Sequence, residues 1–259
     1  MVAYIVTRLT ISPVLNLLTK TGHLRQNFRG ELIPQSGGVV FLLVMLLVAP
    51  LILIFSRGSY WFLFYSGVST MTFLGIIDDF LGDARAKGLK GHFKKLIFEH
   101  ELTTGALKAI GGAFLALMLT VKEPFWYFIV DFLLIGLGIN FMNLFDLRPG
   151  RAGKVFILIG LIIGISYFNY PAVTFLFLAL GIISAYLPLD LKARVMMGDA
   201  GSNVLGFILG YSGVLLFSFK VIVGVVVFLI LFHLFTEKYS LTEIIKNNRV
   251  LSYLDELGR

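Results

Sequence analysis

Long apolar stretches separated by short polar segments run along the whole chain. A helix needs about 20 apolar residues to cross a bilayer, and on that criterion the pattern predicts about nine spans, within a range of about 8–10. We therefore expect an all-α, polytopic integral membrane helical bundle. The predicted spans cover residues 2–19, 38–56, 60–77, 103–121, 125–144, 154–169, 172–188, 201–219 and 221–236.

The composition supports a membrane protein. Hydrophobic residues make up 58% of the 259 residues and charged residues 14%, against about 45–50% and 25% in soluble domains. These values exclude a soluble enzyme, a disordered chain and a coiled coil. The chain has no cysteine, which excludes disulfides, zinc–thiolate sites and thiol chemistry. The net charge of +7 indicates loops that face anionic lipid, and we expect no nucleic-acid partner.

The distribution of Lys and Arg predicts the orientation. Counted loop by loop, one side of the bundle carries only Arg57, Lys122 and Lys220, whereas the loops of the other side and the tail carry most of the remainder. The positive-inside rule makes the basic side cytoplasmic. The N-terminus is then outside and the C-terminus cytoplasmic, and residues 2–19 are interpreted as a retained span rather than a cleaved signal peptide.

The chain shows no linker and no convincing internal repeat, so we predict one domain. Residues 1–236 form its transmembrane part and residues 237–259 a cytoplasmic amphipathic tail, whose apolar residues recur near helical spacing. The tail is expected to lie on the membrane surface or to cap the bundle. The GLIIG (160–164) and GFILG (206–210) segments have the spacing of close helix contacts, with merely tolerated glycine as the alternative.

Three polar groups at the ends of predicted spans are candidates for chemistry, because polar residues at membrane depth are costly. All three lie on the predicted cytoplasmic side. They are Asp78 and Asp79 in GIIDDF, Asn140, Asn143 and Asp146 in NFMNLFD, and Asp199, Ser202 and Asn203 in MGDAGSNVLG.

The types and spacing of these residues favour a hard cation and phosphates. Steps of three keep Asn140, Asn143 and Asp146 near one helix face. The adjacent Asp78 and Asp79 must point in different directions, one toward a metal and the other toward a Lys or a second ligand. Oxygen ligands without Cys or a His cluster suit Mg²⁺ or Mn²⁺. Together with the basic residues of the same side, these acids predict phosphoryl transfer.

Simpler interpretations of the same residues remain open. The Asp pair can be a solvated helix cap, and the two asparagines can form interhelical hydrogen bonds. Asp199 can cap the N-terminus of the eighth span, a role compatible with metal binding.

Four motifs in order carry a family resemblance. IPQSGGV (33–39), GIIDDF (75–80), NFMNLFD (140–146) and MGDAGSNVLG (197–206) resemble those of the polyprenyl-phosphate N-acetylhexosamine-1-phosphate transferases. This family includes the phospho-MurNAc-pentapeptide translocase and the undecaprenyl-phosphate GlcNAc-1-phosphate transferases. Lys94 and Lys95 resemble its basic positions after the Asp pair.

The resemblance implies transfer of a sugar 1-phosphate from a UDP-N-acetylhexosamine to polyprenyl (undecaprenyl) phosphate, with release of UMP. The reaction would use Mg²⁺ or Mn²⁺ at the cytoplasmic face of a bacterial cytoplasmic membrane, in cell-envelope glycan synthesis. The protein would act as a homodimer. The implied metal ligands are Asp199 and Asp79, and the implied catalytic residues are Asp78, Asp79 and Asp146. The implied substrate-binding residues are Asn140, Asn143, Lys94, Lys95 and Ser202, to which we add Arg148 and Arg151 from the sequence itself.

The sequence also departs from the family. After the Asn/Asp motif it reads DLRPGRAGK, without the usual Gly and second acidic element, and it lacks the usual His-rich motif in a last cytoplasmic loop. We therefore interpret it as a shortened member in which Arg148, Arg151 or Arg249 serves as a phosphate clamp. A non-catalytic member that binds polyprenyl phosphate or scaffolds envelope enzymes is one alternative. An ion-coupled transporter, with acids near mid-membrane, is the other.

Overall fold

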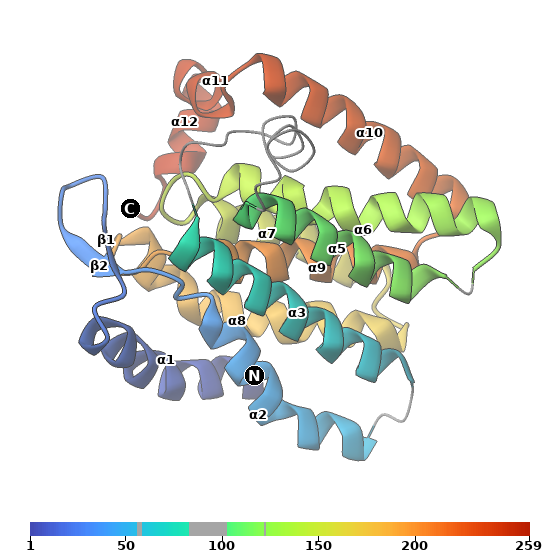
Figure 1. The fold of residues 1–259 in the computed structure, drawn as a ribbon, viewed down its shortest axis with the longest axis horizontal. Coiled ribbons are helices and arrows are strands. Elements are labelled where there is room, and N and C mark those ends of the chain that lie inside the picture. The colour runs from blue at the N-terminus through green and yellow to red at the C-terminus, as the bar shows by residue number, and fades with distance from the viewer. Residues whose placement is uncertain (56–58, 83–102, 122) are drawn as a thin grey trace.

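The computed structural model describes residues 1–55, 59–82, 103–121 and 123–259 (Figure 1). Each predicted span coincides with one of its long helices. These are α1 (Val2–Lys20), α2 (Val39–Phe55), α3 (Ser59–Leu81), α5 (Thr104–Thr120), α6 (Phe125–Phe145), α7 (Arg151–Ser166), α8 (Thr174–Leu191, after a 3₁₀ turn at Pro171–Val173), α9 (Asp199–Leu216) and α10 (Phe219–Lys238). Within the described ranges the strands form one antiparallel hairpin, β1 (Leu24–Gln26) and β2 (Leu32–Pro34).

Among the residues that the structure describes, five helices are long and apolar enough to cross a membrane, namely α1, α3, α6, α10 and α8 with its preceding turn. This agrees with the expected all-α membrane protein. α2 and α5 are apolar but shorter. The count of about nine spans and the orientation stay predictions.

Helix α9 runs between α3 and α6 and contacts both along its length (Figure 1). Most of its residues are buried, so its Ser, Asn and Gly residues are shielded by protein rather than lipid. The GFILG segment confirms the predicted close contact, because a Cβ at Gly206 would lie 2.5 Å from the carbonyl oxygen of Gly138 on α6. Backbones that approach this closely hold the start of α9 in a fixed position.

An aromatic cluster fixes the far ends of the same helices. Phe64 of α3 stacks on Phe175 of α8 with 4.1 Å between ring centroids, and both rings contact Tyr211 of α9. Trp61 is 1% exposed and meets Phe175 edge-on. Offset and edge-on ring pairs stabilise such contacts beyond their buried area. Because α3 and α9 are clamped here, their opposite ends are held in register.

The tail forms two short helices, α11 (Leu241–Asn247) and α12 (Arg249–Glu256). The side chain of Asn248 separates them and accepts hydrogen bonds from the amides of Val250 and Leu251, which caps α12. The tail folds back toward the start of α7 (Figure 1).

Candidate active site

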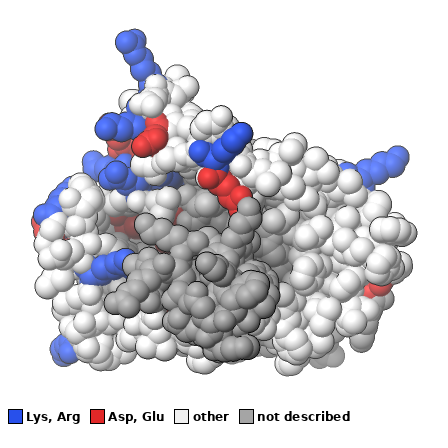
Figure 2. All heavy atoms as spheres, turned by 45° about the horizontal axis from the view of Figure 1, so that its top comes forward, with Lys and Arg blue, Asp and Glu red and all other residues white. Residues whose placement is uncertain are grey.

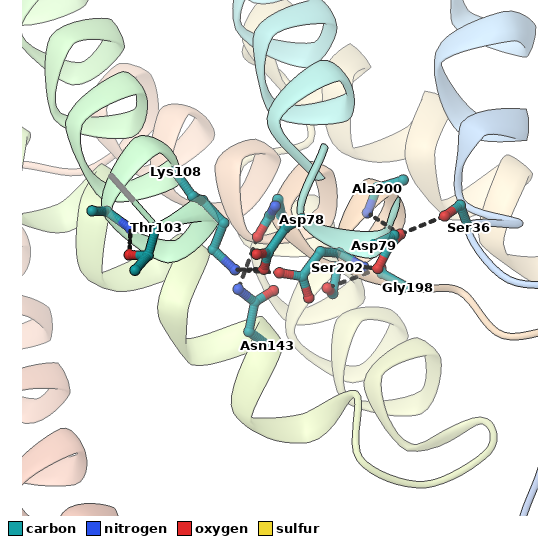
Figure 3. A network of polar contacts seen from close by, with 12 residues as sticks. Ser36, Asp78, Asp79, Thr103, Lys108, Asn143, Gly198, Ala200 and Ser202 are labelled. Carbon is teal, nitrogen blue, oxygen red and sulfur yellow. Dashed lines mark hydrogen bonds and ion pairs between the residues drawn. The ribbon is translucent and has the colours of Figure 1, made fainter. Parts of the chain in front are cut away.

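The ends of α3 and α6 and the start of α9 bring the predicted polar groups together (Figure 3). These segments can approach one another only because they carry glycine at the contacts. A Cβ atom at Gly75 would overlap the backbone of Asp199, and a Cβ atom at Gly38 would overlap the backbone of Gly201. Only glycine permits helices to meet in this way. The acids lie at helix ends, not halfway along the helices as the transporter alternative requires.

Lys108 of α5 lies at the centre of this site. Its ammonium hydrogen-bonds to the carboxylate of Asp199 and lies 3.6 Å from Asp78 Oδ2. All three side chains are largely shielded, with 18–26% of their surface exposed. Lys108 is not among the predicted site residues, although a single cation within an apolar helix is a signal for such a role. The carboxyl groups of Asp78 and Asp199 also hydrogen-bond to each other, so the two acids and the ammonium form one cluster.

Asp79 points away from Asp78, toward the N-terminus of α9 (Figure 3). Its Oδ1 accepts the amide of Asp199 at 3.0 Å, and its Oδ2 accepts the amide of Ala200 at 3.3 Å and the hydroxyl of Ser36 at 2.7 Å. A carboxylate at this position satisfies amides that have no partner within the helix and complements the helix dipole. The cap on α9 is therefore Asp79, not Asp199 as one interpretation of the sequence held.

The α6 group reaches the site through its later members. Asn143 Nδ2 donates to Asn203 Oδ1 of α9 at 2.8 Å, the interhelical bond foreseen as an alternative. The Oδ1 atom of Asn143 is buried without a hydrogen-bond partner among the described residues. Asp146 ends α6, and burial raises the pKa of its carboxyl well above the ordinary value, helped by the negative charges of Asp190 and Asp199. Asn140 is half-buried one turn earlier.

A pocket of about 370 Å³ opens beside these acids. Its walls are the β1–β2 hairpin, the α6–α7 loop and the α8–α9 loop. Its charged lining residues are Asp79, Asp146, Asp190, Asp199, Arg25 and Arg148. Asp190 and Arg25 were not singled out from the sequence. Asp190 is 3% exposed, and its Oδ2 has no partner among the described residues, so it is a buried acceptor within the pocket wall.

The hairpin is joined to the α8–α9 loop by backbone hydrogen bonds. The carbonyl of Pro34 in β2 accepts the amide of Met196 at 2.9 Å, and just after the hairpin the amides of Gly37 and Gly38 donate to the carbonyls of Met196 and Met197 at 2.8 and 2.9 Å. Burial lowers the pKa of the His23 imidazole at the hairpin base, although the negative charge of Asp79 opposes that shift. The hairpin thus forms a fixed wall of the pocket.

Arg151 is absent from the pocket lining. Its guanidinium donates from Nε and a terminal nitrogen to the two carboxylate oxygens of Asp255 in α12, at 2.7 and 2.8 Å, and also to Thr242. Burial alone would raise the pKa of Asp255, but the hydrogen bonds and charges of Arg151 and Arg259 lower it overall. Arg151 therefore anchors the tail, and Arg148 is the predicted clamp that reaches the pocket.

Of the other predicted substrate-binding residues, the structure describes Ser202 but not Lys94 and Lys95. Ser202 is fully buried, and its hydroxyl donates to the carbonyl of Gly198 at 3.1 Å, within the first turn of α9. Lys94 and Lys95 lie outside the described residues. On the face shown in Figure 2, Lys and Arg side chains gather toward one end of the molecule, where acidic atoms are visible in a hollow.

Comparison with known proteins places this site in context. The model of the family described as Glycosyl transferase family 4 matches residues 61–217, more than half of the chain. A phospho-N-acetylmuramoyl-pentapeptide-transferase of Thermotoga maritima is 30% identical over 200 residues, which cover 70% of this chain and 60% of the relative. One of Chlamydia abortus is 28% identical over 211 residues, which cover 71% and 60%. The chain thus spans 60% of the length of these curated relatives.

Proposed function

Because the chain belongs to glycosyl transferase family 4, we propose that it transfers a sugar 1-phosphate from a UDP-N-acetylhexosamine to polyprenyl phosphate and releases UMP. The observation that carries the proposal is the Asp78–Lys108–Asp199 cluster at helix ends beside the pocket. The names of the relatives support a role in cell-envelope glycan synthesis. A homodimer in a bacterial cytoplasmic membrane stays a prediction.

In the proposed reaction, an oxygen of the polyprenyl phosphate attacks the phosphorus that carries the sugar. A new P–O–P bond forms, the bond from that phosphorus to the bridging oxygen breaks, and UMP leaves with the electron pair. The second pKa of a phosphate monoester is about 6, so the nucleophile is largely ionised at neutral pH. No strong base is required, and Asp78 serves to orient the lipid phosphate.

The donor atoms fit Mg²⁺, the cofactor we propose. Within the described ranges no group of three or more His, Asp or Glu forms a complete metal cage. Mg²⁺ is commonly held by one or two carboxylates together with substrate phosphates, and Asp199 and the unpaired Oδ1 of Asn143 supply such oxygens. When bound, the ion would neutralise charge on the pyrophosphate.

The remaining residues position the substrates. Lys108 contacts both Asp78 and Asp199 and can donate to a phosphate oxygen beside them. Arg148 and Arg25 of the pocket wall suit the phosphates of the nucleotide. The unpaired acceptor of Asp190 lies in the same wall. Binding and alignment of two charged substrates supply most of the catalysis in such a transfer.

The test uses the purified protein in nanodiscs with undecaprenyl phosphate, Mg²⁺ and a panel of donors that includes UDP-GlcNAc and UDP-MurNAc-pentapeptide. We expect UMP release with one donor and a loss of at least about a hundredfold in Asp199→Asn. The matched control is Asp131→Asn. Asp131 is a buried acid near the other end of α6, about 22 Å from Asp146 at 1.5 Å per residue. Absence of UMP with every donor, while the lipid phosphate still binds, would favour the non-catalytic alternative.

A further inference from the structure

Two residues at the base of the hairpin form a chain of hydrogen bonds to Asp79. The hydroxyl of Ser36 donates to Asp79 Oδ2 at 2.7 Å, and His23 Nε2 lies 2.9 Å from the same hydroxyl oxygen. A hydroxyl has one proton to donate. Because that proton is committed to Asp79, the imidazole must donate from Nε2. The hydrogen bonds therefore run from His23 to Ser36 and from Ser36 to Asp79.

Packing and burial hold both His23 and Ser36 in place. The His23 ring stacks on Phe80, the residue after Asp79, with ring centroids 3.6 Å apart and ring planes 3° apart. Ser36 is 1% exposed and has φ +57°, a left-handed conformation that favours glycine. Glycine would fit this backbone better than serine. A strained, buried serine whose hydroxyl meets a site carboxylate indicates a functional constraint.

This series of hydrogen bonds ends at the carboxylate of Asp79, whose two oxygens both accept hydrogen bonds. In addition to Ser36, Asp79 accepts the first amides of α9, those of Asp199 and Ala200. Gly198, at φ +69°, leaves room for the carboxylate, because a Cβ there would collide with it. The amide held most closely belongs to Asp199, so the direction of Asp79 sets the start of α9 and the position of the Asp199 carboxylate.

We propose that His23 and Ser36 are positioning residues that lock Asp79 onto the N-terminus of α9 and thereby fix Asp199 in the active site. In this arrangement Asp79 is a cap and not a metal ligand, unlike its assignment from the sequence. The catalytic part of the inference rests on the proposed function. Asp199 faces Lys108 and Asp78 while its amide is held from behind by Asp79.

The experiment uses Ser36→Gly, which removes the hydroxyl and relieves the backbone. It also uses His23→Phe, which keeps a stacked ring but removes the donor, and His23→Gln, which restores an N–H. Ser184→Ala and His233→Phe are matched controls, since both residues bond only to carbonyls of their own helices among the described contacts.

For Ser36→Gly and His23→Phe we expect kcat of UMP release to fall about tenfold or more, with KM for both substrates within about twofold. The melting temperature of Ser36→Gly should not fall, which separates positioning from stability. His23→Gln should recover to within about threefold of the unmodified protein. An unchanged kcat in Ser36→Gly would overturn the proposal.

Two readouts are independent of turnover. Hydrogen exchange at the amides of Asp199 and Ala200 should accelerate in Ser36→Gly and His23→Phe but not in the controls, and unchanged exchange would overturn the inference even in an inactive protein. Mn²⁺ binding, followed by electron paramagnetic resonance, should be lost in Asp199→Asn and kept within about fivefold in Asp79→Asn. Equal loss of Mn²⁺ in both variants would make Asp79 a ligand and refute its assignment as a cap.

Discussion

Replacement of Lys108 by Met tests the charge balance of the site most directly. Methionine keeps the length and apolar stem of the side chain but removes the ammonium, so Asp78 and Asp199 would face each other without a shared cation. At the observed 3.6 Å between Lys108 Nζ and Asp78 Oδ2, and with an effective dielectric constant of about 20, that contact contributes about 4–5 kcal/mol of attraction.

The free-energy cost of removing these groups from water offsets much of that attraction. When Lys108 is removed, the attraction is lost but the cost of desolvating the two acids remains. Breaking a shielded ion pair costs about 3–5 kcal/mol. We expect Lys108→Met to lower the free energy of unfolding by about 3 kcal/mol, and at about 2–4 °C per kcal/mol the melting temperature should fall by about 6–12 °C.

Magnesium provides the decisive comparison. A cation that binds the two carboxylates at a hundred times its Kd stabilises the folded state by about 2.7 kcal/mol. Lys108→Met should therefore regain most of its stability in MgCl₂ but not in NaCl of equal ionic strength, and the unmodified protein should gain less because Lys108 competes. The assay is thermal unfolding in detergent, with Lys220→Met, an exposed lysine on α10, as control. The reasoning is refuted if Lys108→Met melts like the unmodified protein, or if both respond equally to Mg²⁺.

Three further predictions concern packing and the tail. Gly206→Val should destabilise the protein by more than about 3 kcal/mol in thermal unfolding, because its side chain would meet the α6 backbone, whereas Gly224→Val, with open space around its Cβ position, should change stability little. Arg151→Ala should speed hydrogen exchange of α12 and lower the free energy of unfolding by about 3 kcal/mol, with KM for the nucleotide unchanged. A raised KM together with unchanged exchange in α12 would show that Arg151 binds phosphate after all. The lowered pKa of Asp255 means that its ion pair contributes fully above the ordinary value of 3.8 and is lost as the pH falls through the lower folded value. Exchange of α12, corrected for the intrinsic rate, should thus be constant from about pH 8 to 5, and a loosening within that window would contradict the assignment.

Hydropathy and motif spacing were sufficient to predict the helices and the three polar groups. Apolar stretches of this length have few other stable structures, and polar residues at helix ends are visible as interruptions of the pattern. The small-residue spacing of GFILG likewise predicted the close contact between α9 and α6. The orientation, the span count and the residues of the basic loop at 83–102 are still sequence predictions.

The partners of the polar residues were decided only by the tertiary structure. Lys108 meets Asp199 from 91 residues away, Asp79 caps a helix that begins 120 residues later, and Arg151 pairs with Asp255 across 104 residues. No periodicity along the chain encodes such distances. Side-chain direction at a helix end depends on which helices meet there, so the same aspartate pair was compatible with a metal ligand, a base or a cap. The convergence of α3, α5 and α9 gave Asp78 an ammonium and Asp79 the amides of a helix start, because buried charges require partners and those were the ones within reach.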